Sequence, residues 1–284
     1  MEPSGEWVIQ TVEAGDAEDP SLALDASGSP HISYRDGTNE DLKYADWRGS
    51  SWNIQTVDST GDVRWYTSLA LDGSGRPHIS YFYWTNEDLK YAYWTGSSWN
   101  IQTVDNDASG PSSLTLDTSG WPHIAYCGSY SNGRNLKYVY WTGSAWNIQT
   151  VDPTWVNSPS IALDASGSPH ISYNDESNDA MKHTYWTGSS WNIQTVDTSQ
   201  YIDSGTTSLA LDASGSPHIV YSFVDLEYAR WTGSSWNIQT VETGDTTGVG
   251  FDSPSIVLES SGKPHIAYEY ENSLKSVKYA YWSE

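Results

Sequence analysis

Six histidines stand in one recurring motif, and histidine is the side chain best suited to bind a metal or transfer a proton near neutral pH. Each follows a proline, precedes an isoleucine, and recurs after 45 to 48 residues. The six are His31, His78, His123, His170, His218 and His265. Because equal spacing marks equivalent positions in six repeats, we predict a structural role. We expect each ring to hydrogen-bond inside the fold, with His31 linking the Asp25 turn to a Ser or Trp of a neighbouring strand.

Aromatic side chains that break the repeat are better candidates for a binding site. Eight lie between the predicted strands: Trp65, Tyr66, Trp84, Tyr130, Trp155, Tyr201, Phe223 and Phe251. Their neighbours include Asp, Asn and Glu. Rings can stack on the C–H faces of sugars while polar groups bind hydroxyls, so the set favours glycan binding. The alternative interpretation is that these rings fill gaps between loops.

Acidic side chains in the same stretches supply what a glycosidase needs, since that chemistry uses paired carboxylates. The candidates are Glu18, Asp19, Asp62, Asp203 and Asp252, with His183 in place of a recurring tyrosine. No spacing selects a pair, and solvated loop acids would look the same. We therefore predict no catalytic residue, and we keep a carbohydrate-active enzyme as an alternative.

Two acidic loops have oxygen ligands of the kind calcium prefers. They span Asp36–Asp41 and Asn174–Asp179, and neither follows the helix-loop-helix calcium pattern. We expect polar hairpin loops and no cofactor, with calcium as the alternative.

These residues are positioned by a repeated unit whose clearest sign is the sequence Trp-Asn-Ile-Gln-Thr-Val. It begins at Trp52, Trp99, Trp146, Trp191 and Trp236, and a variant spans Trp7–Val12. Each unit contains three further short runs rich in aliphatic and aromatic residues, separated by Gly, Ser, Asn, Asp and Pro. That pattern predicts four short strands per unit.

Six such units predict an all-β, six-bladed β-propeller of four-stranded antiparallel blades in a single domain, 1–284. The blades are expected at about 21–57, 68–104, 113–151, 160–196, 208–241 and 255–282. The last unit lacks its own fourth run, whereas Trp7–Val12 has no unit before it. We therefore predict that residues 7–12 complete the last blade and close the ring, which leaves no unpaired edge.

Variation along the chain is confined to alternate connections. The first and third connections of each unit are nearly constant, as in Asp25–Pro30 and Trp94–Trp99. The second and fourth differ in length and content. Because successive strands run in opposite directions, all the variable loops lie on one face, where we expect any ligand to bind.

Composition excludes some functions. The chain has 36 acidic and 13 basic residues, for a net charge of −23, which argues against nucleic acid as a partner. No apolar run is long enough for a membrane span, and residues 1–7 do not resemble a signal peptide. The single cysteine, Cys127, cannot form an internal disulfide. We expect a monomer.

Several motifs resemble those of known propellers. The turn Asp25-Ala-Ser-Gly-Ser-Pro30 resembles the Asp-box hairpins of sialidase-like propellers, although Gly28 lies three residues after Asp25. The Trp-Thr-Gly-Ser-Ser-Trp hairpins resemble those of six-bladed fucose-binding lectins. The histidine motif resembles the bridging network of WD-repeat blades. Sialidase chemistry needs clustered arginines. Because the six here lie at non-equivalent places, we predict no cluster.

These observations favour a non-enzymatic binding module that takes a glycan or a protein on the variable face, displayed outside a prokaryotic cell. A structural scaffold with no small ligand is the remaining alternative.

Overall fold

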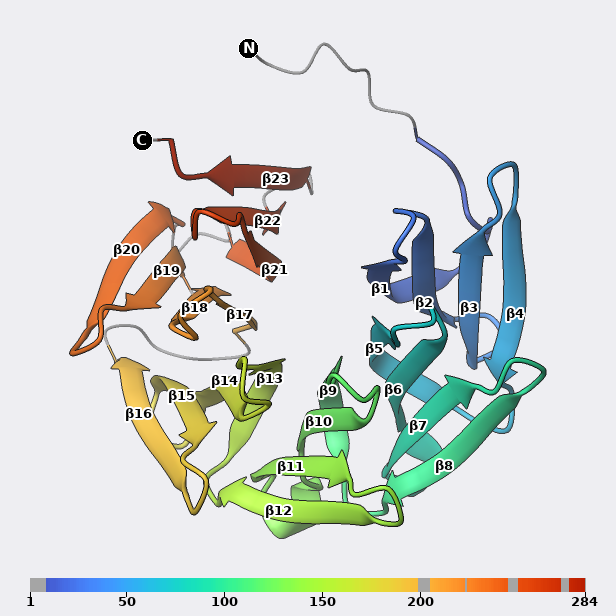
Figure 1. Cartoon of the computed structure of the whole chain (residues 1–284), viewed down its shortest axis with the longest axis horizontal. Coiled ribbons are helices and arrows are strands. Elements are labelled where there is room, and N and C mark those ends of the chain that lie inside the picture. Colours follow the sequence, from blue (N-terminus) through green and yellow to red (C-terminus); the bar gives the residue numbers. More distant parts are fainter. Residues whose placement is uncertain (1–8, 199–204, 223, 245–249, 272–275, 284) are drawn as a thin grey trace.

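Six antiparallel sheets stand around a central channel, which confirms the predicted all-β propeller (Figure 1). The computed structural model describes residues 9–198, 205–222, 224–244, 250–271 and 276–283. Five sheets have four strands in chain order, and the sixth has three within the described residues. Besides strands, the described residues contain two short 3-10 helices, η1 (Trp84–Asn86) and η2 (Tyr130–Asn132).

Each sheet runs outward from the channel in sequence order. The innermost strands are β1 (Ala17–Leu24), β5 (Val63–Leu71), β9 (Ser109–Leu116), β13 (Val156–Leu163), β17 (Thr207–Leu211) and β21 (Gly250–Leu258). The second strands are β2 (Pro30–Asp36), β6 (Pro77–Tyr83), β10 (Pro122–Cys127), β14 (Pro169–Asp175), β18 (Pro217–Ser222) and β22 (Pro264–Glu271).

The outer half of each sheet repeats in the same way. The third strands are β3 (Asp41–Trp47), β7 (Asp88–Trp94), β11 (Leu136–Trp141), β15 (Ala180–Trp186), β19 (Leu226–Trp231) and β23 (Ser276–Tyr281). The outermost strands are β4 (Trp52–Asp58), β8 (Trp99–Asp105), β12 (Trp146–Asp152), β16 (Trp191–Asp197) and β20 (Trp236–Glu242).

The nearly constant turns are held by local hydrogen bonds. In the first, Asp25 Oδ1 accepts from the backbone N–H of Ser27 and of Ser29, both at 2.8 Å. Gly28 has φ of +82°, a conformation that glycine adopts without strain. The aspartate and the glycine therefore recur because the turn geometry requires them.

The innermost strands begin earlier than the sequence predicts. β1 starts at Ala17 rather than Ser21, and β5 starts at Val63 rather than Ser68. A register shift separates the two halves of each strand, between Glu18 and Ser21 in β1 and between Arg64 and Ser68 in β5. In these two blades the last part of the loop before the innermost strand therefore pairs with the end of the second strand, beyond a β-bulge.

A contact between a carboxylate and a tyrosine joins neighbouring blades, and a lysine completes it except in the fifth blade, where Glu227 takes the lysine's place. The acid that ends an outermost strand accepts a hydrogen bond from a tyrosine in the next blade's second strand. For Asp152 the donor is Tyr173, at 2.7 Å, and Lys182 of the same blade lies 3.3 Å from the carboxylate. The same tyrosine contact occurs at Asp58, Asp105, Asp197 and Glu242. We call this contact the seam clasp.

A second contact repeats nearer the constant turns. In three blades the tryptophan that begins the outermost strand donates its indole N–H to a glutamine of the preceding blade, whereas Trp52 and Trp236 have no such partner among the described residues. The pairs are Trp99 with Gln55 at 3.1 Å, Trp146 with Gln102 at 3.0 Å and Trp191 with Gln149 at 3.0 Å. Each of these indoles also stands edge-on to a third-strand tyrosine of the preceding blade. The seams are therefore apolar layers with fixed polar contacts.

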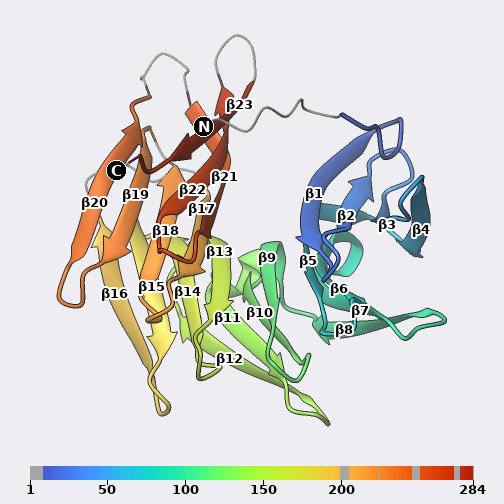
Figure 2. The same cartoon turned by 45° about the horizontal axis from the view of Figure 1, so that its top comes forward.

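The first and sixth sheets do not contact each other as their neighbours do (Figures 1 and 2). Of the predicted closing strand, Trp7 and Val8 lie outside the described residues, and residues 9–12 are in no strand here. Closure by residues 7–12 therefore stays a prediction. No helix among the described residues is long and apolar enough to span a membrane.

Candidate binding site at the channel mouth

The innermost strands surround a cavity where the variable loops emerge. Its volume is about 530 Å³, within the range typical of small-molecule sites. The first residues of all six innermost strands form its wall, which is rich in Ser, Thr and Pro. Representative lining residues are Asp19, Tyr66, Ser112, Ser158, Ser253 and Glu269. We call this cavity the channel mouth, and its hydroxyls and acids suit a ligand with many hydroxyl groups.

Strained backbone recurs around the channel mouth. Asp19, Tyr66, Ser158 and Ser253 have positive φ, of 49°, 56°, 49° and 48°. Each lies at the bulge of its innermost strand and in the cavity wall. Only glycine adopts this conformation without cost, and Gly110 takes it at the matching place in β9. Strain of this kind tends to gather at functional sites.

Tyr66 and Asp19 are the channel-mouth residues best suited to bind a ligand. The Tyr66 side chain is 43% exposed. Burial raises the pKa of Asp19, although the backbone N–H of Tyr66 partly opposes the shift, and the charges of Glu18 and Asp252 raise it further. Asp252, predicted as a loop acid, therefore lies close enough to Asp19 to affect its ionisation. The channel mouth combines an exposed ring with carboxylates.

A second aromatic group lies on the rim, around Trp84 of η1. The guanidinium carbon of Arg64 lies 4.8 Å from the Trp84 ring centre, and Phe82 contacts the indole edge-on. Arg64 Nε lies 2.5 Å from Asp62 Oδ2, and Arg35 Nη2 lies 3.8 Å from Asp62 Oδ1. Two arginines therefore converge on Asp62, an acid of the chain itself, which is not the arginine cluster that sialidase chemistry needs. These contacts make Asp62 a poor candidate for acid–base chemistry.

A third group joins Tyr130 and Trp155 from neighbouring blades. Their ring centres are 5.8 Å apart, and Tyr130 is 44% exposed. Arg134 lies 5.0 Å from the Tyr130 ring centre and donates to Asn157 Oδ1 at 2.9 Å. Two residues predicted independently from the sequence thus come together on the variable face.

Of the other predicted ligand-binding residues, three have side chains outside the described part of the structure and one lies in the core. The backbone of Trp65 lies in β5, but its side chain is outside the described residues, as are Tyr201 and Phe223. Phe251 is not on an exposed loop as expected. It lies in β21, is 7% exposed and packs against Tyr268 and Tyr270. Phe251 is therefore a core residue because β21 extends beyond the bulge.

The remaining loop acids also have specific partners. Glu18 forms an ion pair with Arg35. Asp252 Oδ1 accepts from the backbone N–H of Ser253 at 2.6 Å. Asp203 lies outside the described residues. Of the acids named from the sequence, Asp19 is the one that lines the channel mouth.

In the two loops considered for calcium, a lysine forms an ion pair with an aspartate. Lys43 Nζ lies 2.8 Å from Asp36 Oδ2, and Lys182 Nζ lies 2.5 Å from Asp175 Oδ2. The hydrogen bond from Lys43 lowers the pKa of Asp36 well below its usual range. No group of three or more metal-binding side chains occurs in the described part of the chain. In both loops an ammonium thus already neutralises the leading carboxylate.

The six recurrent histidines bridge the constant turn to the third strand. For His218, Nδ1 lies 2.6 Å from the Tyr228 hydroxyl, and Nε2 lies 3.6 Å from Asp212 Oδ2. The matching tyrosine contact occurs at His31, His78, His123 and His265. The partner is thus a tyrosine of the same blade and not the expected Ser or Trp. The strand register explains this partner. Arg230 lies directly opposite His218 on the neighbouring strand, and Tyr228 lies two residues from Arg230.

His183 takes the tyrosine's place in the fourth blade. Its Nε2 lies 3.2 Å from His170 Nδ1, and Trp236 contacts its ring edge-on. Burial lowers the pKa of His183 to about 3. A buried neutral imidazole that fills a repeated structural position is not a catalytic candidate.

Sequence reasoning did not predict two features of the channel mouth. The hydroxyl-rich wall comes from bulge residues that looked like ordinary strand ends. Glu269 looked like part of a loop but lies in β22 opposite Asp252. A signal was present: proline follows the bulge position in four units, at Pro20, Pro111, Pro159 and Pro254.

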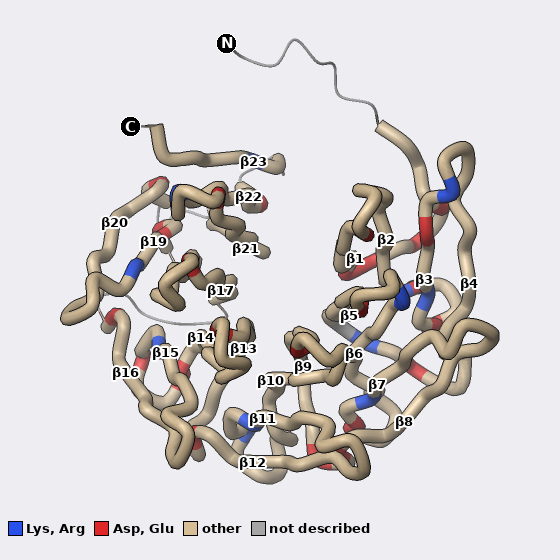
Figure 3. The backbone as a smooth tube through the Cα atoms, viewed as in Figure 1, with Lys and Arg blue, Asp and Glu red and all other residues tan. Residues whose placement is uncertain are grey.

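Basic residues are scattered over several blades and interspersed with acids (Figure 3). Several of the lysines form ion pairs within the seam clasps.

Comparison with known proteins supports the fold. No family model matches the chain, and no curated protein matches it. Among solved structures, the fucose-specific lectin of Aleuria aurantia is 14% identical, with a TM-score of 0.57 over 94% of this chain and 95% of that one. The intramolecular trans-sialidase of Ruminococcus gnavus is 12% identical, with a TM-score of 0.58 over 94% of each chain.

A third similar structure is an ulvan lyase, a polysaccharide lyase. It is 14% identical, with a TM-score of 0.61 over 92% of this chain and 77% of that one. The chain is thus a six-bladed β-propeller whose structural neighbours include a sugar-binding lectin and enzymes of carbohydrate chemistry. At these identities the likeness concerns the fold, and function must be argued from the channel mouth and its rim.

Proposed function

We propose that the protein is a glycan-binding module that takes its ligand at the channel mouth and on the adjoining rim. The observation that carries this proposal is the combination of the exposed Tyr66 ring with hydroxyls and the Asp19 carboxylate in one cavity of about 530 Å³. Aromatic faces bind the C–H faces of sugars, and carboxylates accept strong hydrogen bonds from hydroxyls.

The rim supports the same interpretation. Trp84 and the Tyr130–Trp155 pair are each held by an arginine, so their rings are ordered before a ligand arrives. Ordering in advance lowers the entropic cost of binding. The acids at the channel mouth favour a neutral glycan over an anionic one, because like charges repel.

The test is a glycan array with the wild-type protein, followed by titration of any hit. The triple variant Tyr66→Ala, Trp84→Ala, Trp155→Ala is expected to lose binding and keep the wild-type circular dichroism spectrum. A matched control is Trp121→Ala, which removes a 43% exposed tryptophan from the constant-turn face. Parallel arrays with calcium and with chelator test the metal alternative. A blank array, or binding that survives the triple variant, would contradict the proposal.

A carbohydrate-active enzyme is the second candidate, favoured by Asp19, which lines the cavity and whose pKa is raised by burial. A carboxyl with a raised pKa can donate a proton, and glycoside chemistry combines such a group with a second carboxylate. Under this alternative, Asp19→Asn abolishes release of reducing sugar from a bound glycan but retains binding. Binding without turnover by the wild-type protein would exclude it.

A further inference from the structure

The first blade contains a complete seam clasp, although no described strand precedes it. Tyr34 donates to Glu13 Oε2 at 2.7 Å, and Lys43 donates to Glu13 Oε1 at 2.7 Å. These hydrogen bonds, first from Lys43 and then from Tyr34, lower the pKa of Glu13. Glu13 therefore occupies the place that Asp58, Asp105, Asp152, Asp197 and Glu242 take at the other five seams.

Glu13 also has the matching place in the sequence. At the other seams the clasp acid directly follows an outermost strand that begins with tryptophan, such as Trp52–Asp58. Glu13 directly follows residues Trp7–Val12. The clasp thus fixes the end of a segment that has the sequence of an outermost strand.

Within the described part of the chain, the sixth blade has three strands and lacks the outermost strand that this segment resembles. Val277 and Tyr279 of β23 are 83% and 60% exposed, whereas the matching Leu89 and Tyr91 of β7 are 1% and 3% exposed. On the first blade, Leu22 is 63% exposed and the matching Leu69 is 7% exposed. These exposed surfaces therefore correspond to surfaces that are buried between neighbouring blades elsewhere in the ring.

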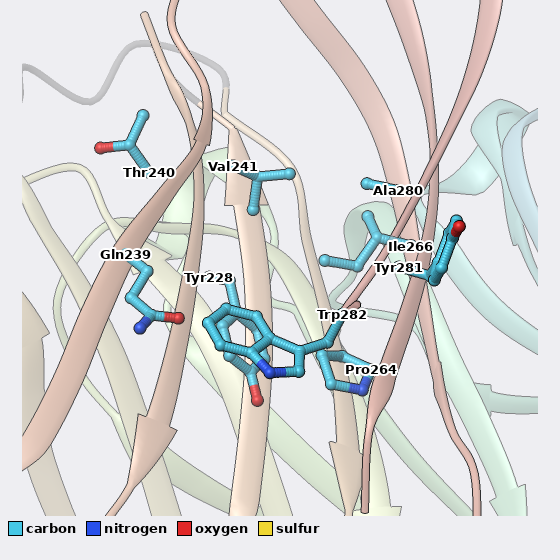
Figure 4. Close-up of a pocket in the computed structure, with 9 residues that line it drawn as sticks. All are labelled: Tyr228, Gln239, Thr240, Val241, Pro264, Ile266, Ala280, Tyr281 and Trp282. Atoms are coloured by element: carbon cyan, nitrogen blue, oxygen red, sulfur yellow. The ribbon is translucent and has the colours of Figure 1, made fainter. Parts of the chain in front are cut away.

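A pocket marks where the missing tryptophan would lie. Its volume is about 240 Å³, and Tyr228, Gln239 and Trp282 line it (Figure 4). At an earlier seam the matching pair, Tyr44 and Gln55, receives the indole of Trp99. Tyr228 and Gln239 are thus a tyrosine–glutamine pair in position to receive an indole.

An unpartnered donor marks the other side of the same seam. Trp52 Nε1 is buried and has no hydrogen-bond partner among the described residues. Its counterparts Trp99, Trp146 and Trp191 donate to the glutamine three residues after the tryptophan that begins the preceding outermost strand. Trp236 Nε1 also lacks a partner among the described residues, at a seam where the matching Gln194 hydrogen-bonds His183 instead. Gln10 follows Trp7 at the same separation as Gln55 follows Trp52, so Gln10 is the matching glutamine in the Trp7 segment.

We propose that residues 7–12 dock on β23 as the fourth strand of the sixth blade and close the ring. The register follows from the other blades, where Trp47 pairs with Trp52 and Ala45 with Ile54. Trp7 then lies opposite Trp282, and Ile9 lies opposite Ala280. The Trp7 indole fills the pocket and donates to Gln239, and Gln10 accepts from Trp52. Closure also fixes the spacing between Asp19 of β1 and Asp252 of β21 at the channel mouth.

The test is a cysteine cross-link in the full chain. Paired residues in neighbouring antiparallel strands lie close enough for a disulfide. The variant Ile9→Cys, Ala280→Cys is expected to form an intramolecular disulfide under mild oxidation, identified by peptide mass spectrometry in the monomer band. The native Cys127 is fully buried and does not compete. The control Ile9→Cys, Tyr281→Cys is one residue out of register and is expected to cross-link at least tenfold more slowly.

The outcomes distinguish whether residues 7–12 or a second copy of the chain pairs with the exposed edge of β23. Disulfide-linked dimers without intramolecular product would show that a second copy supplies the strand and would overturn the proposal. Absence of any cross-link in the paired variant would overturn it too. Faster cross-linking of the control would overturn the register.

Thermal unfolding provides an independent measurement. Trp7→Ala and Gln239→Ala are each expected to lower the melting temperature. The double variant should unfold close to the temperature of Trp7→Ala alone, because both substitutions remove one contact. Additive effects of the two substitutions would show that Trp7 does not dock against Gln239.

Discussion

The seams between blades and the channel mouth are built from the same repeat but follow opposite rules. At the seams the same tyrosine–carboxylate contact recurs, with buried tyrosines and partly buried tryptophans. At the channel mouth the matching bulge positions carry Asp19, Tyr66, Gly110, Ser158 and Ser253. Positions that hold the ring are constant, and positions that face the cavity differ. In this protein, residues that recur in every blade stabilise the fold, whereas residues that differ between blades mark the candidate site.

The largest expected effect comes from breaking a seam. Tyr173 is fully buried and donates to Asp152, so Tyr173→Ala creates a cavity and removes a hydrogen-bond donor from a buried carboxylate. We expect a loss of about 3–5 kcal/mol in the free energy of unfolding. Chemical denaturation measures it, and Tyr173→Phe, which keeps the ring, should lose only about 1–3 kcal/mol. Equal losses for the two variants would show that ring packing contributes little.

A smaller loss is expected when the histidine bridge is removed. His170→Ala leaves the His183 ring without its neighbour and removes the link to the Asp164 turn. We expect about 1–3 kcal/mol of destabilisation, seen as a lower melting temperature, with glycan binding unchanged. Unchanged stability would contradict the structural role of these six histidines.

The same histidines predict how stability depends on pH. Burial lowers the pKa of His78, His123, His170 and His218. A lowered folded pKa means that the unfolded chain takes up protons first, so stability is fully present above about pH 6.5 and is lost as the pH falls. The melting temperature should therefore drop between pH 6.5 and 5.

His183→Tyr is the matched variant for this pH effect. Burial lowers the pKa of His183 to about 3, and tyrosine occupies the same position in the other five blades. The variant should flatten the fall in melting temperature below pH 6.5 while leaving stability at pH 8 nearly unchanged. An unaltered dependence of the melting temperature on pH would show that His183 does not contribute to this effect.

The smallest stability effect has the opposite sign and separates the channel mouth from the seams. Tyr66 and Ser158 both have positive φ, so replacement by glycine relieves strain of about 1 kcal/mol at either site. We expect Tyr66→Gly and Ser158→Gly to unfold at or slightly above the wild-type temperature. Differential scanning calorimetry checks this, and a clear loss of stability in either variant would contradict the assigned strain.

The fold was predictable from the sequence because each blade repeats its turn residues and hydrophobic pattern almost without change. The constant turns and the placement of Tyr130 and Trp155 on one face followed from that pattern and strand alternation, whereas the contact between the two rings did not. The channel mouth was less predictable, since bulges at Glu18–Ser21 and Arg64–Ser68 depend on inter-strand register. Phe251 was misplaced for that reason. The arginine pair at Asp62 was missed because its members lie far apart in the repeat.

The most direct test of the central claim is titration of an array-selected glycan against Tyr66→Gly and Ser158→Gly by isothermal calorimetry. Both substitutions relieve the same strain at matching bulges, but only Tyr66→Gly removes an aromatic ring from the cavity wall. We predict at least a tenfold loss of affinity for Tyr66→Gly and wild-type affinity for Ser158→Gly. Equal affinities for both variants would contradict a glycan site at the channel mouth.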